Sequence, residues 1–249
     1  MNIYEALYEA HGQAQSDEAV VGGGDFEWIG RIELGLLLME GLTPTDTLVD
    51  FGCGTGRLAV HAIPMLVGGQ YIGTDVSPSM LEKAQRRVGG RIAQPPCRVS
   101  WIQQTTTEFP LAARSVDMIC AFSVFTHIEH EDSYRYLRDA LRVVRPGGRF
   151  IFSCLPLDLE LARDVFLSEA QWDVRARWGK VRNIATSIDL MTAIARIAGW
   201  TVVRWYPGDE PNIRIAGTDE LVVPGQAACV LEAPGPGSAS PAETRATRP

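Results

Sequence analysis

The sequence predicts an α/β fold with a mostly parallel sheet, and three observations support this prediction. Apolar runs of strand length alternate along the chain with segments of helical periodicity. Strands that alternate with helices are typical of crossover units, which join parallel strands. The chain is also long enough, at 249 residues with 46% hydrophobic side chains, to bury a sizeable core.

Seven apolar runs are the expected strands, each bounded by polar or turn-forming residues. They are Thr47–Phe51, Tyr71–Asp75, Cys97–Gln103, Val116–Phe122, Gly148–Leu155, Trp200–Tyr206 and Gln226–Glu232.

Helices are expected before and between these strands. Residues 25–40 place apolar side chains on one helical face. Two further helices are expected at Ser79–Val88 and Asp132–Arg145, the second stopped by a Pro-Gly-Gly sequence. Ser187 opens a last helix, which closes at Gly199.

Composition divides the chain into three parts. Residues 1–46 are expected to form an N-terminal helical cap or lid, and residues 47–232 the main domain. Within the main domain, the charged segment 157–186 carries two tryptophans, which would either cover an acceptor site as a lid or pack in the ordinary way. The tail, residues 233–249, has too few large apolar groups to pack and is expected to be disordered.

Charge and composition argue against several classes of protein. The formal net charge of −7 disfavours binding to a nucleic-acid backbone, which needs a concentrated basic face. No apolar run reaches the roughly 18 to 20 residues of a membrane span, and the N-terminus has no signal-peptide pattern. The five cysteines are scattered along the chain, a pattern that is typical of free thiols in a reducing compartment. We therefore expect a cytoplasmic protein with neither a membrane nor a nucleic-acid partner.

The strongest signal in the sequence is a glycine-rich turn. A strand containing Asp50 runs into Gly52, Gly54 and Gly56, and a helix follows. Glycines let the backbone approach a ligand closely, and the start of a helix offers unpaired N–H groups. Asp75 ends the second strand 25 positions after Asp50, where an acid can accept both ribose hydroxyls of a nucleoside. Together these features predict a nucleoside site.

Two nucleoside ligands fit this turn. The stretch Gly54–Ala59 satisfies the dinucleotide pattern G-x-G-x-x-G/A, which is a weak signal on its own. Asp50 favours a methyl donor, because an acid before the turn would repel a pyrophosphate and attract the sulfonium and ammonium groups of S-adenosylmethionine. A short-chain NAD enzyme is further disfavoured, since neither Lys83 nor Lys180 follows a tyrosine by four positions.

Four segments match the motifs of one known family, in the same order along the chain. They are Asp50–Gly56, Tyr71–Ser77, Ser115–Ile119 and Leu141–Gly148. Over residues 47–150 the sequence thus resembles the class I S-adenosylmethionine-dependent methyltransferases. The resemblance implies a Rossmann-like sheet of seven strands in the order 3-2-1-4-5-7-6, with strand 7 antiparallel and helices on both faces. It also implies S-adenosyl-L-methionine as the cofactor.

The resemblance further implies which residues bind the cofactor. One position departs from the family pattern, because Thr105 stands where many members carry an aspartate beside the adenine. A hydroxyl or backbone group would then hold the adenine amino group. The expected cofactor-binding residues are Asp50, Gly52, Cys53, Gly54, Gly56, Asp75, Val76, Met80, Gln104, Thr105, Thr106, Phe122 and Ser123.

The loop after the fourth strand is the expected acceptor side of the site. His127 is the candidate general base, since its ordinary pKa lies near neutrality. The alternative is that it braces the loop. His130 is a weaker candidate, and Glu129 is expected to face solvent.

The sequence Phe122-Ser123-Val124-Phe125 at the end of the fourth strand sets two subclasses aside. It is not the [DNS]-P-P-[FYW] motif of methylases that act on nucleic-acid amino groups. It also lacks the carboxylate with which catechol-type enzymes hold magnesium, so we expect no metal.

The leading hypothesis is therefore a metal-independent methyltransferase that acts on a small-molecule acceptor, most directly at oxygen. Nitrogen and carbon acceptors remain open. The alternatives are an RNA or protein methyltransferase and a non-catalytic protein that binds S-adenosylmethionine. The sequence does not decide whether the chain acts alone or as a homodimer.

Overall fold

The computed structural model describes residues 3–14 and 25–235 of the chain. Its strands are β1 (Thr47–Phe51), β2 (Gln70–Asp75), β3 (Arg98–Gln103), β4 (Val116–Ala121), β5 (Val144–Pro156), β6 (Ala185–Thr186), β7 (Thr201–Tyr206), β8 (Ile213–Arg214), β9 (Leu221–Val222) and β10 (Ala227–Glu232).

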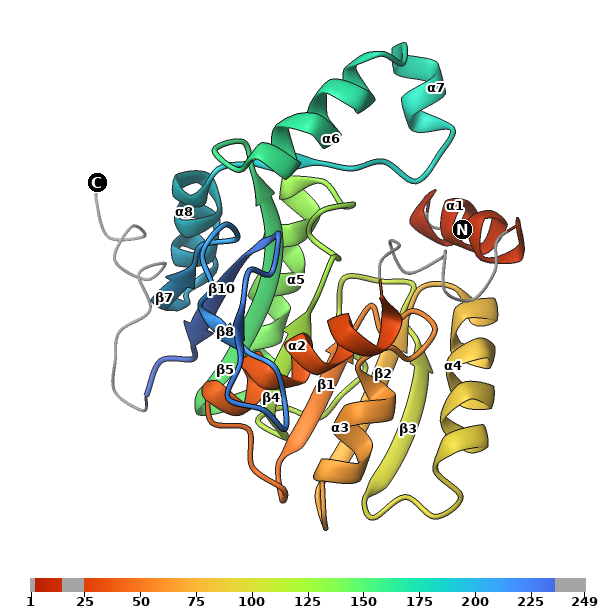
Figure 1. Cartoon of the computed structure of the whole chain (residues 1–249), viewed down its shortest axis with the longest axis vertical. Coiled ribbons are helices and arrows are strands. Elements are labelled where there is room, and N and C mark those ends of the chain that lie inside the picture. Colours follow the sequence, from red (N-terminus) through yellow and green to blue (C-terminus); the bar gives the residue numbers. More distant parts are fainter. Residues whose placement is uncertain (1–2, 15–24, 236–249) are drawn as a thin grey trace, which may run out of the picture.

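The main sheet runs in the order β3-β2-β1-β4-β5-β10-β7 (Figure 1). The strands from β3 to β5 pair in parallel, whereas β10 is antiparallel to both β5 and β7. Because β7 and β10 are the sixth and seventh of the expected strands, the predicted order 3-2-1-4-5-7-6 with an antiparallel last strand is confirmed.

Helices cover both faces of this sheet. Leu48 and Ile151 pack against α2 and α3, whereas their sequence neighbours Val49 and Phe150 pack against α5 and α8. Alternate side chains of a strand point to opposite faces, so burial on both faces explains the continuous apolar runs in the sequence. The helices are α1 (Ile3–Ala14), α2 (Phe26–Met39), α3 (Ala59–Met65), α4 (Pro78–Arg91), α5 (His130–Val143), α6 (Glu160–Ala170), α7 (Val174–Trp178) and α8 (Ile188–Ala198).

The ends of α8 lie where the sequence predicts them, but those of α5 do not. The Ser187 side chain accepts a hydrogen bond from Leu190 N at 3.1 Å, and Gly199 closes α8 at φ +105°. Helix α5, expected to reach Arg145, ends two residues earlier, because a residue before proline is disfavoured in the helical region. Residue 144 instead begins β5, and residues 145–148 loop out between two of its pairings with β4.

Helices α6 and α7 and two small β elements were absent from the prediction. Strand β6 pairs in parallel with the last two residues of β5, Leu155 and Pro156, and it follows α6 and α7 in the chain. The hairpin β8–β9 lies between β7 and β10 in sequence and packs against α2. Strand β6 lies at the end of the sheet that carries the glycine-rich turn, because it pairs with the last two residues of β5. The hairpin lies along α2 (Figure 1).

The two N-terminal helices differ in their role. Helix α2 was expected to belong to a cap, but Leu36 and Leu37 are fully buried with the residues of α3 and β1, so α2 is part of the main core. Helix α1 lies separately over the end of the sheet, beside α4 (Figure 1). Ala233, the first residue of the expected disordered tail, is buried and bonded to Gly148, and residues 236–249 lie outside the described part. None of the described helices has the length and apolar character needed to cross a membrane.

Candidate active site

A cavity opens where β1, β2 and β4 end, which is the edge at which open parallel sheets bind their ligands. We call it the donor cavity. Most of the residues predicted from the sequence line it. They are Asp50, Gly52, Cys53, Gly54, Asp75, Val76, Met80, Gln104, Phe122, Ser123 and His127.

The glycine-rich turn owes its shape to positive φ angles and close contacts. Gly52 has φ +74° and Gly54 has φ +52°. A Cβ atom on Gly52 would lie 2.4 Å from a methyl carbon of Val124, so only glycine fits there. Gly56 was predicted to bind the cofactor, but it does not line the cavity. A Cβ atom on Gly56 would lie only 3.3 Å from Ala84, so glycine at this position instead lets the turn before α3 pack closely against α4.

Asp50 lies at the floor of the donor cavity, within the sheet. Its Oδ2 accepts a hydrogen bond from the Tyr71 hydroxyl at 2.6 Å, and its side chain is buried. Burial raises the pKa of Asp50 to about 7, against the lowering effect of the Tyr71 hydrogen bond. A positively charged ligand group at this place would favour the ionised carboxylate.

Asp75 is fixed at the end of β2 by backbone hydrogen bonds. Its Oδ2 accepts from Gly54 N and its Oδ1 from Ser77 N, both at 2.9 Å. Burial raises its pKa to about 6, although these bonds favour the charged form. The carboxylate has more lone pairs than these bonds use, so Asp75 can still accept a hydrogen bond from a ligand hydroxyl.

Of the three residues after β3 that were predicted to bind the cofactor, only Gln104 lines the donor cavity. Gln104 is 3% exposed and lines the donor cavity, and neither its Oε1 nor its Nε2 has a hydrogen-bond partner among the described residues. Thr105 and Thr106, also predicted to bind the cofactor, are exposed and do not line the cavity. A buried amide without a partner is costly, so Gln104 is the group here that is suited to pair with a polar ligand edge.

Helix α1 covers the donor cavity and brings two residues that the sequence analysis did not identify. Tyr4 and Tyr8 line the cavity, four positions apart on one helical face. The Tyr4 hydroxyl donates to Asp132 Oδ2 at 2.8 Å and accepts from Glu129 N at 3.1 Å. Glu9 accepts from the Ser77 hydroxyl at 2.6 Å. These bonds join α1 to the loops that follow β2 and β4.

A buried ion pair borders the same cavity. Arg57 follows the glycine-rich turn, and its Nη2 donates to Glu33 Oε1 of α2 at 2.5 Å. Both side chains are largely buried. Neither residue was predicted, because the pair joins two segments whose proximity no local pattern indicates.

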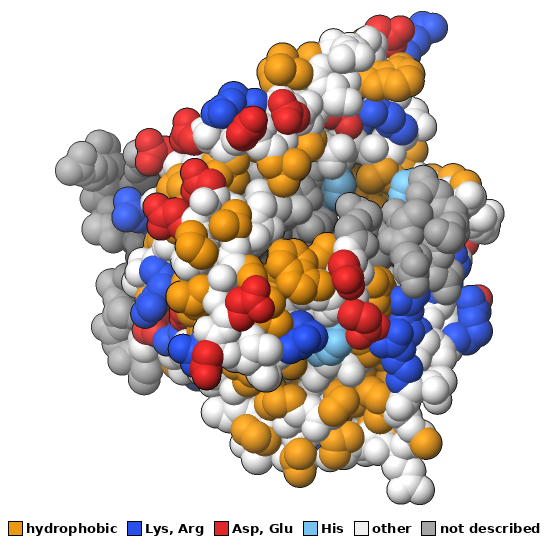
Figure 2. All heavy atoms as spheres, viewed as in Figure 1, with side chains coloured by type: hydrophobic (Ala, Val, Ile, Leu, Met, Phe, Trp, Pro, Cys, Tyr) orange, Lys and Arg blue, Asp and Glu red, His pale blue; other side chains and the backbone are white. Residues whose placement is uncertain are grey.

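A second cavity, of about 310 Å³, adjoins the first, and we call it the acceptor cavity. It lies between α2, α6 and the ends of β4, β5 and β10, and Figure 2 shows hydrophobic side chains around the hollow on this face. The two cavities share the residues Glu33, Arg57, Phe122, Ser123 and His127.

His127 lies at this junction with a defined tautomer. Its Nδ1 is 2.7 Å from the backbone oxygen of Arg182, and because a carbonyl oxygen only accepts, Nδ1 carries the proton and Nε2 keeps a lone pair. Burial lowers the pKa of His127 below its ordinary value of 6.5, so the ring is neutral at pH 7. The Tyr8 ring meets it edge-on, with ring centroids 6.1 Å apart.

The other two candidates of this loop do not reach either cavity. His130 Nε2 lies 3.0 Å from Thr186 Oγ1 of β6. Glu129 was expected to face solvent, but its carboxylate is one-third exposed and forms an ion pair with Arg182. The segment after α7 therefore engages both Glu129 and, through its backbone, His127.

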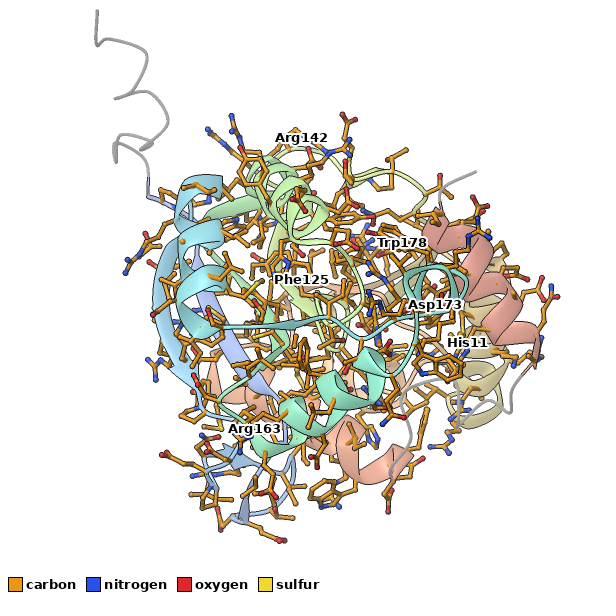
Figure 3. All side chains as sticks on the ribbon, turned by 90° about the horizontal axis from the view of Figure 1, so that it is seen from above. His11, Phe125, Arg142, Arg163, Asp173 and Trp178 are labelled. Carbon is orange, nitrogen blue, oxygen red and sulfur yellow. The ribbon has the colours of Figure 1, made fainter. Side chains whose placement is uncertain are left out.

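Helices α6 and α7 extend over the open end of the sheet. Figure 3 shows this segment from above, with Asp173 and Trp178 at the end that lies toward α1. The Arg182 guanidinium stacks on the Trp178 ring at 4.1 Å. Leu161 and Val165 of α6 line the acceptor cavity. Their position fits the proposal that residues 157–186 include a lid over the acceptor.

Comparisons with known proteins agree with this arrangement. Residues 48–148 match the family described as a methyltransferase domain. An arsenite methyltransferase of Halobacterium salinarum is 28% identical over 179 residues, which is 72% of this chain and 43% of that protein. The N-methyltransferase FrzE of Cladobotryum sp is 32% identical over 177 residues, which is 64% of this chain and 58% of the relative. The chain thus spans about half the length of these relatives.

Solved structures have the same fold. The magnesium protoporphyrin IX methyltransferase of Synechocystis, a structure with bound S-adenosylhomocysteine (SAH), superposes with a TM-score of 0.59 at 15% identity. The match covers 92% of this chain and 91% of the other. Residues 48–148 are therefore a methyltransferase domain, and the fold is that of the class I S-adenosylmethionine-dependent methyltransferases.

Proposed function

We propose that this protein is an S-adenosylmethionine-dependent methyltransferase that methylates a small molecule at oxygen, with His127 as the general base. The observation that carries the proposal is the junction of the donor and acceptor cavities at Phe122, Ser123 and His127. A methyl transfer needs donor and acceptor to meet in line at one point. A neutral imidazole at that point is suited to take a proton from a hydroxyl.

The donor cavity fits S-adenosylmethionine group by group. Asp75 has free lone pairs for the ribose hydroxyls, and the unpartnered Gln104 amide can pair with the polar edge of adenine. The buried Asp50 carboxylate favours a ligand with positive groups. A dinucleotide would instead bring a pyrophosphate toward this acid.

The size and lining of the acceptor cavity favour a small molecule. Its apolar walls include Ile32 and Leu36 of α2 and Leu155 of β5. A largely apolar site of this size is typical of small-ligand pockets, whereas a nucleic-acid site would present basic side chains to the phosphates.

The reaction then needs little from the chain beyond positioning and one proton transfer. When bound, S-adenosylmethionine supplies a methyl group that bonds to the acceptor oxygen as the carbon–sulfur bond breaks and leaves its electron pair on sulfur. His127 Nε2 takes the hydroxyl proton, and the backbone oxygen of Arg182 holds the ring through Nδ1–H. The resulting imidazolium releases its proton to water.

A labelled-donor experiment tests this proposal. The protein is incubated with S-adenosylmethionine carrying a trideuterated methyl group and a panel of phenols, enols, alcohols and amines, and products are analysed by mass spectrometry. We expect the label on a hydroxyl oxygen, and no product from the matching methyl ether. Label found only on amines, or only on RNA or protein added to the same mixture, would overturn it.

A further inference from the structure

The described residues that line the acceptor cavity carry no net charge. Its ionised residues, Glu33 and Arg57, neutralise each other in a buried pair, and His127 is neutral at pH 7. A charged acceptor would lose its hydration there without gaining an unpaired countercharge, which is energetically unfavourable. The cavity therefore selects an uncharged molecule.

The polar end of this cavity is a ring of hydrogen bonds that joins the C-terminal ends of β4 and β5 to the start of β10. Ser123 N donates to Ser153 Oγ at 2.8 Å, and the Ser153 hydroxyl donates to Gln226 Oε1 at 2.7 Å. Gln226 Nε2 then donates to Ser123 Oγ at 3.1 Å and closes the ring. All three residues line the acceptor cavity.

This ring leaves hydrogen-bond donors available to a ligand. The amide of Gln226 has a second N–H, which donates to none of the described residues. The Ser123 hydroxyl reaches Gln226 Oε1 only over 3.4 Å, longer than an ordinary O–H···O bond, so a closer acceptor would replace it. The neighbouring Thr126 hydroxyl is 1% exposed, lines the same cavity and has no partner in the described structure.

The backbone at Ser123 supports a role in binding. Ser123 has φ +56°, a left-handed conformation that is uncommon for a residue with a side chain. Glycine would adopt it without strain, yet this position presents a hydroxyl to both cavities. Such strain is found where the side chain serves a site.

We infer that the acceptor is an uncharged, largely apolar hydroxy ketone, whose carbonyl oxygen accepts hydrogen bonds from Gln226 and Ser123 while its hydroxyl faces His127. This inference rests on the proposed function, because it names the acceptor class of that reaction. Gln226 and Ser123 are then the specificity-determining residues, and the apolar walls take the rest of the molecule.

A matched pair of phenols tests this inference by calorimetry. The probes are 7-hydroxy-1-tetralone and 5,6,7,8-tetrahydro-2-naphthol, which differ only in the ketone. Each is titrated into the full-length protein saturated with SAH. We expect the ketone to bind roughly tenfold more tightly, the value of one good hydrogen bond to a desolvated group. Gln226→Leu and the near-isosteric Gln226→Glu should abolish that preference without changing the affinity for tetrahydronaphthol.

Controls separate this inference from the function on which it rests. Gln171→Leu removes an exposed amide that lines neither cavity, and it should keep the preference. A preference that survives in both Gln226 variants, or a wild-type protein that binds SAH but neither probe, would overturn the acceptor class and leave the methyltransferase proposal standing. If SAH itself does not bind, both proposals fail.

Discussion

The hydroxyl of Tyr71 on β2 donates a 2.6 Å hydrogen bond to Asp50 Oδ2 on β1, in the floor of the donor cavity. This bond ties two neighbouring strands together beneath the glycine-rich turn. It also holds a carboxyl group that is almost completely buried. The pair shows how the site keeps a buried acid that costs stability and favours a cationic ligand.

Asp50→Asn should make the unliganded protein more stable at pH 8. Since burial raises the pKa of Asp50 from 3.8 to about 7, the folded state holds this proton more tightly than the unfolded state. The contribution of the protonated Asp50 side chain to stability is therefore fully present below about pH 4 and is lost as the pH rises through 7. We expect the variant to gain about 1 to 4 kcal/mol at pH 8 and almost nothing at pH 4, measured by urea unfolding.

The same variant should bind S-adenosylmethionine at least tenfold more weakly, because it lacks the carboxylate that favours positive groups. Asp158→Asn, at an exposed position, is the matched control and should change neither quantity. A stability that does not rise with this substitution at pH 8 would contradict the buried-charge account.

His127→Ala should lower kcat by roughly 10²- to 10⁴-fold while leaving the affinity for SAH nearly unchanged. The rate of the wild type should fall only below pH 6.5, since burial lowers the pKa of His127 and a protonated ring cannot take a proton. His130→Ala, which alters a histidine outside both cavities, should retain activity. An unchanged kcat would remove His127 from the mechanism, and a joint loss of stability and SAH affinity would make it a brace of the loop.

Gln104→Leu should weaken SAH binding roughly tenfold without destabilising the protein. The buried amide has no partner among the described residues, so its removal costs the unliganded fold no hydrogen bond. Thr105→Val, beside it and exposed, should leave SAH affinity unchanged. Calorimetry measures the SAH affinity of both variants, and thermal unfolding measures their stability. If Thr105→Val weakened SAH binding more than Gln104→Leu did, Thr105 would be the adenine contact.

EDTA should leave methyl transfer unchanged, since the end of β4 offers no carboxylate to hold a divalent ion. Turnover is measured before and after chelation and again with added magnesium. Activity that disappears on chelation and returns with magnesium would show that the prediction is wrong.

Much of the fold could be predicted, because its signals are local. Ser187 and Gly199 mark both ends of α8 by their capping chemistry, and the continuous apolar runs reveal strands covered on both faces. The order of the sheet followed from the family resemblance. The short strand β6 and the hairpin β8–β9 could not be predicted, since two-residue strands leave too little pattern to recognise.

The site divides in the same way. Asp50 and Asp75 could be identified because each occupies a fixed place relative to a strand end. Tyr4 and Tyr8 could not, since their pattern indicates an amphipathic helix but not the part of the sheet that it covers. Gln104, Thr105 and Thr106 were all predicted to bind the cofactor, but only Gln104 lines the donor cavity, because which side chain after a strand turns inward depends on the course of the loop.

The most direct test of the account is a calorimetric comparison of S-adenosylmethionine, SAH and NAD on the wild-type protein and Asp75→Ala. We predict that the first two ligands bind and NAD does not. We also predict that Asp75→Ala weakens both by about 1 to 3 kcal/mol, the range for hydrogen bonds to a charged group. Tight binding of NAD, with no response to S-adenosylmethionine or SAH, would contradict the account.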